Sequence, residues 1–410
     1  MQFPLPAVSA RLRSGGGRLV RRLGLLPGGE PDGLGEDARL AGTALEQRVV
    51  AFFPEPPRNG YQLEQWLPAL EALHARRGVA VVTQDSRTTA WLRGRTALPV
   101  LCIARTATLD GILHRSDVAL ALYVSHHPRN FQMLRFSTVG HVYIGHGESD
   151  KAVSASNQLK AYDRVFVAGP AAEDRVLAEL LWFDRSRLVR VGRPQAAAPA
   201  PRPVPAVPTV LYAPTWEGAQ PSMAYSSVPG HGSALVASLM AEGLRVVYRP
   251  HPRTGANRRD VAAADAALRR SFDSPDAQRT GSRVDAGRPL DEAFAEADVL
   301  VTDVSSVAVE WLPTGRPMVV TVPADPAAVV APSPLLDVVP RLPGTATGTA
   351  GTLVRRCLDD DREAPSRAAL VEHYLGGSDP ARALETFLEA CDDVIAARDA
   401  LRSALPGASR

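Results

Sequence analysis

The stretch "RPQAAAPAPRPVPAVP" (residues 193–208) divides this sequence of 410 residues into two parts. Its prolines cannot donate to a sheet ladder or continue a helix interior, so the stretch predicts an extended linker. On both sides of it, short apolar runs alternate with helical stretches, which is typical of parallel sheets covered by helices on both faces. A chain of this length also exceeds one ordinary hydrophobic core. We therefore predict two α/β domains, each doubly wound and Rossmann-like.

The predicted strands fall into two sets, one on each side of the linker (194–208). The first domain (47–193) has apolar runs at 48–55, 78–85, 99–104, 117–125, 141–147 and 163–169. The second domain (209–377) has such runs at 209–216, 244–252, 298–306 and 316–323. Helical periodicity adds stretches at 62–76, 231–242, 258–270 and 381–405. Two such sheets face each other across a cleft, which resembles the GT-B type glycosyltransferase fold, and in that fold a C-terminal helix such as 378–410 can cross back to the first domain.

Composition and charge exclude several classes of protein. A net charge of +2 gives no overall field that would attract nucleic acid. The three cysteines are scattered, so they predict neither a disulfide framework nor a metal knuckle, and they fit a reducing cytoplasm. No run reaches the roughly 18 apolar residues that a membrane span needs. We expect a globular cytoplasmic enzyme.

The first 46 residues form a basic leader, which we expect to be flexible. It lacks the apolar core of a signal peptide, and Gly15–Gly17 would interrupt a helix. Its positive charges lie among leucines and come from Arg11, Arg13, Arg18, Arg21 and Arg22. The interpretation we favour is a solvated, disordered segment. The alternative is a basic surface that contacts anionic lipid on the inner face of the cell membrane.

Four polar motifs follow predicted strands, where ligands bind in folds of this kind. They are "GHGESDK" (145–151), "YAPTW" (212–216), "RPHP" (249–252) and "TDVSS" (302–306). The glycines of the first motif let backbone and substrate approach a histidine at a strand end. The prolines of the third hold its histidine on a stiff, extended backbone, although a partly buried structural histidine is the alternative. The tryptophan of the second could stack on a flat base or pack between the domains.

The motif "TDVSS" predicts a strand that ends at Asp303 and a helix that begins at Ser305 or Ser306 and runs to Leu312. Backbone N–H groups at such a helix start suit a phosphate, and an ordinary capped helix is the alternative. His126 and His127 also follow a strand, but we expect them on a surface loop. The sequence contains no His-x-x-x-His, paired Cys-x-x-Cys or strand-end Asp-x-Asp, so it predicts no metal site.

Together the motifs resemble those of the CDP-glycerol glycerophosphotransferase family, enzymes of teichoic acid and related polymer synthesis. The family-like "LPTGRPMVV" follows the fourth motif, and "YLGGSDPARALETF" near the end is similar to the family's Gly-x-x-Ser-x-Arg stretch. The resemblance covers roughly residues 110–390. Val304 replaces the usual tyrosine, Glu148 replaces a threonine, and "VPADPAAVVAPSPLLDVV" replaces an aromatic and acidic stretch. The departures leave the acceptor open.

The resemblance implies an enzyme that moves glycerol phosphate from CDP-glycerol, or another CDP-alditol such as CDP-ribitol, to a hydroxyl of a cell-wall or capsular polymer or lipid-linked acceptor. It implies His146 as the general base and His251 as the second catalytic residue. The donor and its phosphates would be bound by Arg249, Thr215, Trp216, Asp303, Ser305, Ser306, Ser378 and Arg382. Gly145, Gly147 and Lys151 would support the turn, and neither a cofactor nor a metal is implied. Whether one unit or many are added stays open.

Two other functions fit the same pattern. The first is a nucleotide-sugar glycosyltransferase, because one fold hosts several chemistries. The second is a non-catalytic, membrane-associated member of a polymer-assembly complex, which the basic leader and the altered fourth motif would suit.

Overall fold

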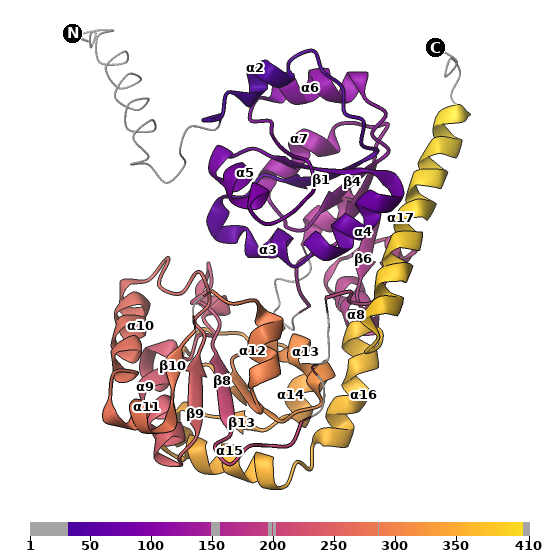
Figure 1. The fold of residues 1–410 in the computed structure, drawn as a ribbon. Coiled ribbons are helices and arrows are strands. Elements are labelled where there is room, and N and C mark those ends of the chain that lie inside the picture. Colours follow the sequence, from indigo (N-terminus) through magenta and orange to yellow (C-terminus); the bar gives the residue numbers. More distant parts are fainter. Residues whose placement is uncertain (1–31, 149–155, 196–198, 200–201, 286, 405–410) are drawn as a thin grey trace, which may run out of the picture.

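Two parallel sheets, each covered by helices, make up the protein, and a long C-terminal helix runs beside the first of them (Figure 1). This computed structural model describes residues 32–148, 156–195, 199, 202–285 and 287–404. The predicted pair of Rossmann-like domains is confirmed. Most of the basic leader, and Lys151, lie outside the described residues. Among the helices of the described ranges, none is long and apolar enough to span a bilayer.

The first sheet has the strand order β3-β2-β1-β4-β5-β6-β7, with every neighbouring pair parallel. Its strands are β1 Val49–Phe53, β2 Val79–Thr83, β3 Val100–Cys102, β4 Leu120–Tyr123, β5 Gly140–Tyr143, β6 Arg164–Val167 and β7 Leu188–Arg190. All five residues of β1 are buried because helices cover both faces of the sheet, which explains its unbroken apolar run. The edge strand β7 was not predicted, because Leu188 and Val189 are only half-buried and Arg190 is exposed.

Helices cover this sheet on both faces. They are α2 Glu36–Leu40, α3 Tyr61–Glu64, α4 Leu67–Arg77, α5 Ser86–Arg93, α6 Thr106–Arg115, α7 Phe131–Leu134 and α8 Pro170–Glu179, with short 3-10 turns at Pro57–Asn59, Pro128–Asn130, Asn157–Ala161 and Arg185–Arg187. The single helix predicted at 62–76 is wrong in one respect, because it breaks at Gln65 and Trp66 into α3 and α4. Pro68 has no N–H group and lies in the first turn of α4, where proline is tolerated. The break turns Gln65 and Trp66 toward the candidate site.

The second sheet has the order β10-β9-β8-β11-β12-β13, again parallel throughout. Its strands are β8 Thr209–Ala213, β9 Arg245–Tyr248, β10 Arg283–Val284, β11 Val299–Thr302, β12 Met318–Thr321 and β13 Arg341–Leu342. The four central strands match the predicted runs. The two edge strands have two residues each, too few for a periodic signal.

Helices also flank the second sheet. They are α9 Val228–Ala241, α10 Arg259–Ser271, α11 Pro275–Thr280, α12 Leu290–Glu296, α13 Ser306–Trp311, α14 Pro334–Val338, α15 Ala350–Asp359 and α16 Ala364–Leu375, with 3-10 turns at Pro221–Met223, Leu312–Thr314 and Gly344–Thr349. Gly315 ends the turn after α13 with φ 66°, a left-handed conformation that suits glycine.

The last helix, α17 (Pro380–Ser403), begins beside the second domain and packs on the first (Figure 1). The ring of Phe387 packs against that of Trp66 with centroids 5.1 Å apart and planes tilted by 44°, and Cys391 and Ile395 continue the buried stripe. At its far end Arg398 donates to the carbonyl of Thr138 at 2.7 Å. The chain therefore crosses between the domains twice, once at the linker and once before α17.

Candidate active site

The turn after β5 presents His146 at the carboxyl end of the first sheet. Its Nδ1 lies 2.7 Å from the carbonyl oxygen of Val124, which makes Nδ1 the proton donor and leaves the lone pair on Nε2. Two side chains from the break between α3 and α4 form hydrogen bonds with the backbone of this turn. Trp66 Nε1 donates to the carbonyl of Gly145 at 2.7 Å, and Gln65 Nε2 donates to the carbonyl of His146 at 2.5 Å. The imidazole therefore has a fixed tautomer on a fixed backbone.

Gly147, the next residue, touches the second domain. A Cβ at this position would lie 3.2 Å from Cβ of Ser306 and 3.4 Å from a carboxylate oxygen of Glu310, both on α13. A side chain here would press on α13, because the two domains approach each other closely. On the other side of the turn, Glu148 pairs with Arg175 at 3.1 Å.

Asp303 is buried, and its carboxylate faces protein groups. One oxygen accepts hydrogen bonds from the backbone N–H groups of Thr215 at 2.8 Å and Ser227 at 3.1 Å, and the other accepts from the hydroxyl of Thr321 at 2.5 Å. Burial raises the pKa of Asp303, while hydrogen bonds from Ser227 and Thr321 oppose that shift. The expected donor-binding residue therefore ties together the ends of β8 and β12 and the start of α9. Thr215 is buried at the same junction.

Ser305 and Ser306 follow at the start of α13. Ser305 is the N-cap residue with an extended backbone, as predicted, but its hydroxyl lies 3.1 Å from that of Thr302 and makes no side-chain cap. Ser306 is half-buried and faces Gly147 of the first domain. Of the pair, Ser306 is the residue at the domain boundary.

The "RPHP" loop carries His251 against Trp216. The two rings are nearly parallel, with centroids 6.3 Å apart, and the guanidinium carbon of Arg253 lies 3.8 Å from the centroid of the Trp216 ring. The backbone N–H of Arg253 donates to Nδ1 of His251 at 3.1 Å, so Nε2 carries the proton of the neutral imidazole. Buried Glu217 fixes the rest of this loop by accepting from the N–H groups of Gly255, Asn257 and Arg258.

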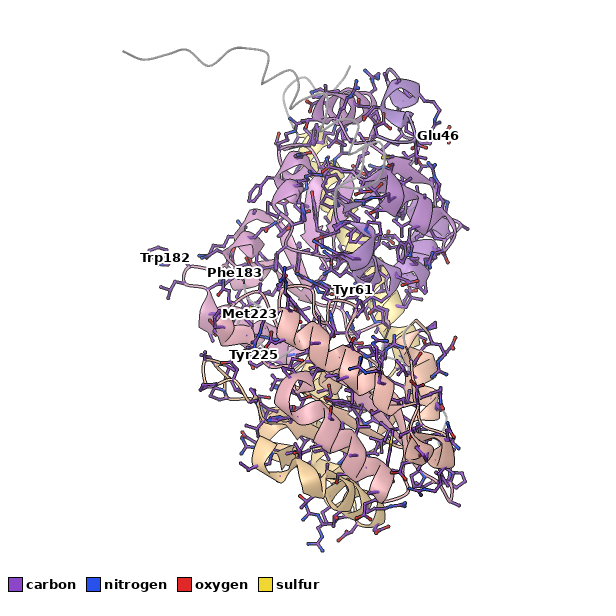
Figure 2. All side chains as sticks on the ribbon, turned by 90° about the vertical axis from the view of Figure 1, so that its left-hand side faces the viewer. Glu46, Tyr61, Trp182, Phe183, Met223 and Tyr225 are labelled. Carbon is purple, nitrogen blue, oxygen red and sulfur yellow. The ribbon has the colours of Figure 1, made fainter. Side chains whose placement is uncertain are left out.

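Tyr61 joins the two histidines. Its ring centroid lies 6.3 Å from that of His146 and 5.7 Å from that of His251, edge to face in both cases. Figure 2 shows Tyr61 at the level where the two domains meet. Burial raises the pKa of its hydroxyl, which is therefore uncharged at neutral pH. Tyr61 was not predicted as a site residue because it begins a short helix of the first domain and belongs to no strand-end motif.

Three other predicted residues lie outside this cluster of rings. Arg249 pairs with buried Asp285 at 3.3 Å, and Asp285 also pairs with Arg288. Ser378 and Arg382 are exposed at the start of α17, close to where the chain crosses between the domains.

His126 is a correction to the sequence analysis. We expected it on a surface loop, but its ring stacks on Tyr143 with centroids 4.3 Å apart and planes 6° from parallel. Burial, followed by the nearby His146, lowers the pKa of His126 to about 4. It therefore stays neutral beside the candidate base. His127 is half-buried and caps the 3-10 turn that follows.

A cavity of about 230 Å³ opens beside the loop after β8. Its walls come from the carboxyl ends of three strands of the second sheet and include Glu217, Ser226, Arg258 and Asp325. The hydroxyl of Ser226 is buried and has no hydrogen-bond partner among the described residues. The part of the chain that the structure describes contains no group of three or more acidic, histidine or cysteine side chains that could hold a metal ion.

Comparisons with solved structures support the fold. The wall teichoic acid polymerase TagF superposes with a TM-score of 0.54 at 12% identity, over 97% of this chain and 100% of that one. A glycosyltransferase from Rickettsia africae gives 0.55 at 10% identity, over 87% and 99% of the two chains. MnaA of S. aureus, solved with UDP, gives 0.53 at 12% identity, over 85% and 97%. These similarities confirm the GT-B fold.

Sequence comparison shows a resemblance to one family. No curated protein matched the chain. Residues 202–375 match the model of the CDP-glycerol:poly(glycerophosphate) glycerophosphotransferase family. This range contains three of the four strand-end motifs, and the match confirms the predicted resemblance of this chain to that family.

Proposed function

We propose that this protein transfers a glycerol phosphate unit from CDP-glycerol, or from a similar CDP-alditol, to a hydroxyl of a cell-wall or capsular polymer acceptor. The acceptor oxygen attacks the phosphorus that bears glycerol, the bond from that phosphorus to the bridging oxygen breaks, and CMP leaves. The observation that carries the proposal is the contact of Tyr61 with both His146 and His251, which brings the two candidate catalytic residues together. The match to the family model over 202–375 supports the choice of donor.

The two histidines suit different steps. With Nδ1 donating to the carbonyl of Val124, His146 has its lone pair on Nε2, as a general base for the acceptor hydroxyl requires. His251 has the opposite polarity, since its Nδ1 accepts from the backbone of Arg253 and its Nε2 carries the proton. His251 can therefore donate to the leaving phosphate. A base and a donor arranged in this way move one proton on to the protein and stabilise charge on the departing CMP.

The donor would lie on the second domain. We propose that its diphosphate lies near His251 and Ser306. Its nucleoside would enter the cavity beside the loop after β8 and form a hydrogen bond with the Ser226 hydroxyl. The transfer would need no metal, because imidazole and hydroxyl donors compensate the phosphate charge. Full activity after dialysis against EDTA would support this point, and activity restored only by a divalent cation would contradict it.

The direct test is nucleotide release. The purified protein is incubated with CDP-glycerol, CDP-ribitol and UDP-sugars, with a glycerol phosphate oligomer as acceptor. We expect CMP release and a lengthened acceptor with a CDP-alditol. His146→Gln and His251→Gln should each abolish the transfer, whereas exposed His114→Gln, the control, should keep it. Release from UDP-sugars alone would favour a glycosyltransferase, for which the fold shared with the Rickettsia africae glycosyltransferase is the supporting observation.

The non-catalytic alternative predicts a different result. If neither His146→Gln nor His251→Gln changed polymer synthesis in cells, the protein would act as a member of an assembly complex. Loss of polymer in both variants, with the His114→Gln control intact, would exclude that alternative.

We also propose that the protein works in the cytoplasm on the inner face of an anionic membrane, where a lipid-linked acceptor would be presented. The turn after α8 supports this, since Leu181 is 77% and Trp182 97% exposed. Trp182 has φ 58°, an unfavourable conformation for a bulky residue, and Figure 2 shows it projecting from the first domain. Arg185, which is 67% exposed and pairs with buried Glu173, lies nearby. An exposed tryptophan with an adjacent arginine suits a lipid interface.

Vesicles test this membrane contact. The double variant Leu181→Ser, Trp182→Ser should co-sediment less with phosphatidylglycerol vesicles than the wild-type protein. Leu401→Ser, which changes a leucine 72% exposed on α17, is the matched control and should bind as the wild type does. Equal binding of all three proteins would place the contact elsewhere, for which the basic leader is the remaining candidate.

A further inference from the structure

Arg193, the first residue after the hinge glycine Gly192, is a buried charge between the domains. Gly192 has φ 74°, and a Cβ on it would lie 2.8 Å from Ala383 of α17. The chain therefore turns sharply where the linker and the crossing into α17 meet. The side chain of Arg193 is only 4% exposed. A buried guanidinium is costly unless it is paired, so its partners indicate what it is for.

The partners of Arg193 come from both domains. Its Nη2 donates to Gln65 Oε1 at 2.6 Å and to Glu310 Oε1 at 3.2 Å, and its guanidinium carbon lies 6.0 Å from the centroid of the Trp66 ring. Gln65 and Trp66 lie in the break between α3 and α4, whereas Glu310 lies on α13. One side chain thus links a loop of the first domain to a helix of the second.

Each partner leads directly to one half of the candidate site. Gln65 and Trp66 hold the carbonyls of His146 and Gly145. Glu310 is one turn after Ser306 on α13, and its carboxylate also faces Gly147. Burial raises the pKa of Glu310, and the charge of Arg193 opposes that shift. The two buried side chains therefore each favour the charged form of the other. A continuous path of hydrogen bonds therefore runs from His146 through Gln65 and Arg193 to α13.

We propose that Arg193 is a positioning residue that keeps the base turn of His146 in register with α13, so that acceptor activation and donor phosphate meet only in the closed arrangement of the domains. The inference rests on the proposed function and adds to it a hinge residue that touches neither substrate. A rotation about the linker would separate Arg193 from Glu310 while Gln65 stays with the first domain. The network is complete only when both domains are in place.

Kinetics of Arg193→Gln test the proposal. We expect kcat for CDP-glycerol to fall by about 10- to 100-fold, because small displacements of a catalytic group are that costly, while KM for the donor changes little. Arg193→Lys should recover part of the loss, because an ammonium keeps the positive charge beside Glu310 but lacks the length and the planar shape of the guanidinium, whose Nη2 contacts both Gln65 and Glu310. The matched control is Arg367→Gln, which removes another buried arginine paired with a carboxylate, that of Asp361, away from the hinge. The control should lose stability without a split between kcat and KM.

Two further variants keep the test decisive if Arg193→Gln folds poorly. Gln65→Met cuts the path at the other end, and we expect it to lower kcat as Arg193→Gln does. The double variant Arg193→Gln, Glu310→Gln should be no slower than Arg193→Gln alone, since both changes break one network. A wild-type kcat in Gln65→Met, or losses in the double variant that multiply, would overturn the proposal.

Hydrogen exchange separates this inference from the proposed function. In Arg193→Gln the amides of 144–148 and of α13 should exchange faster than in the wild-type protein. In Arg367→Gln the amides of 144–148 should exchange as in the wild-type protein. This readout needs no substrate. If the wild-type protein released no CMP from CDP-glycerol but the exchange result held, the proposed function would fail and the coupling would stand. Unchanged exchange in Arg193→Gln would refute the coupling.

Discussion

Replacing Asp303 separates its structural role from its charge. In the protein its carboxylate accepts the N–H groups of Thr215 and Ser227 and the hydroxyl of Thr321. Alanine would leave the two N–H groups buried without an acceptor, at a cost of about 1–3 kcal/mol each. We therefore expect Asp303→Ala to lower the free energy of unfolding of the second domain by about 2–6 kcal/mol.

Asparagine at the same position should cost much less. Its amide oxygen can accept from both backbone N–H groups, and its amide nitrogen can donate to the Thr321 hydroxyl, which accepts as readily as it donates. Only the charge assistance is lost, and the difference between charged and neutral hydrogen bonds is about 1 kcal/mol. Asp303→Asn should therefore stay within about 2 kcal/mol of the wild type.

The dependence on pH gives an independent check. Burial raises the pKa of Asp303 above its ordinary value, so the native protein binds this proton more tightly than the unfolded chain does. The contribution of Asp303 to stability is then greatest below the ordinary pKa of aspartic acid. It falls as the pH rises from that value to the raised native pKa, and it is constant above. Asp303→Asn removes this dependence, so its disadvantage should shrink as the pH rises through that window.

Urea unfolding at several pH values, followed by tryptophan fluorescence, measures all three quantities. Trp311 is buried in the core of the second domain and reports on it. The two domains need separate transitions in the fit, because a chain of two domains rarely unfolds in one step. If Asp303→Ala were as stable as Asp303→Asn, the carboxylate would not stabilise the segments at Thr215 and Ser227. A direct role of Asp303 in binding the donor would then be the better explanation.

Three other changes probe the cluster around the histidines. Tyr61→Phe should keep a near wild-type kcat because the ring contacts remain. Tyr61→Ala should lower kcat by about tenfold or more, because both imidazoles lose their packing partner. Equal kcat values for Tyr61→Ala and the wild-type protein would show that the ring does not position the histidines. Gly147→Val should lower kcat without changing the stability of either domain, because the valine γ-carbons would collide with Ser306 and push the domains apart. A crystal structure of this variant with an unchanged contact between the domains would contradict this. Ser226→Ala should raise KM for CDP-glycerol about three- to tenfold, the worth of one hydrogen bond, with kcat constant; an unchanged KM would remove the nucleoside from this cavity.

The central strands could be predicted from the sequence because burial on both faces leaves a continuous apolar run. The five residues of β1 and of β2 are all buried and all apolar apart from a terminal threonine. The edge strands could not be predicted in this way. In β10 the two residues are arginine and valine, and both are half-buried, so local composition does not distinguish them from a loop.

The strand-end motifs found the histidines, but they could not tell which polar side chains face the cleft. Asp303 and Ser306 are separated by three positions, and each follows the same strand. Asp303 is buried under three hydrogen bonds from the protein, whereas Ser306 stands at the domain boundary. This difference depends on which parts of the chain pack over each side chain, and that cannot be predicted from residue type and spacing.

Tyr61, Gln65 and Arg193 show a second limit of the sequence. None of them belongs to a recognisable strand-end motif, and Tyr61 and Arg193 gain their contacts with His251 and Glu310 only when the second domain is in place. Tyr61 reaches His251, and Arg193 reaches Glu310, from more than 100 residues away in the chain. The linker was predicted from its prolines as a spacer, yet Arg193, directly before it, carries a buried charge that a simple spacer would not need. A group that depends on the arrangement of two domains needs partners on both sides, and the buried guanidinium of Arg193 has them in Gln65 and Glu310.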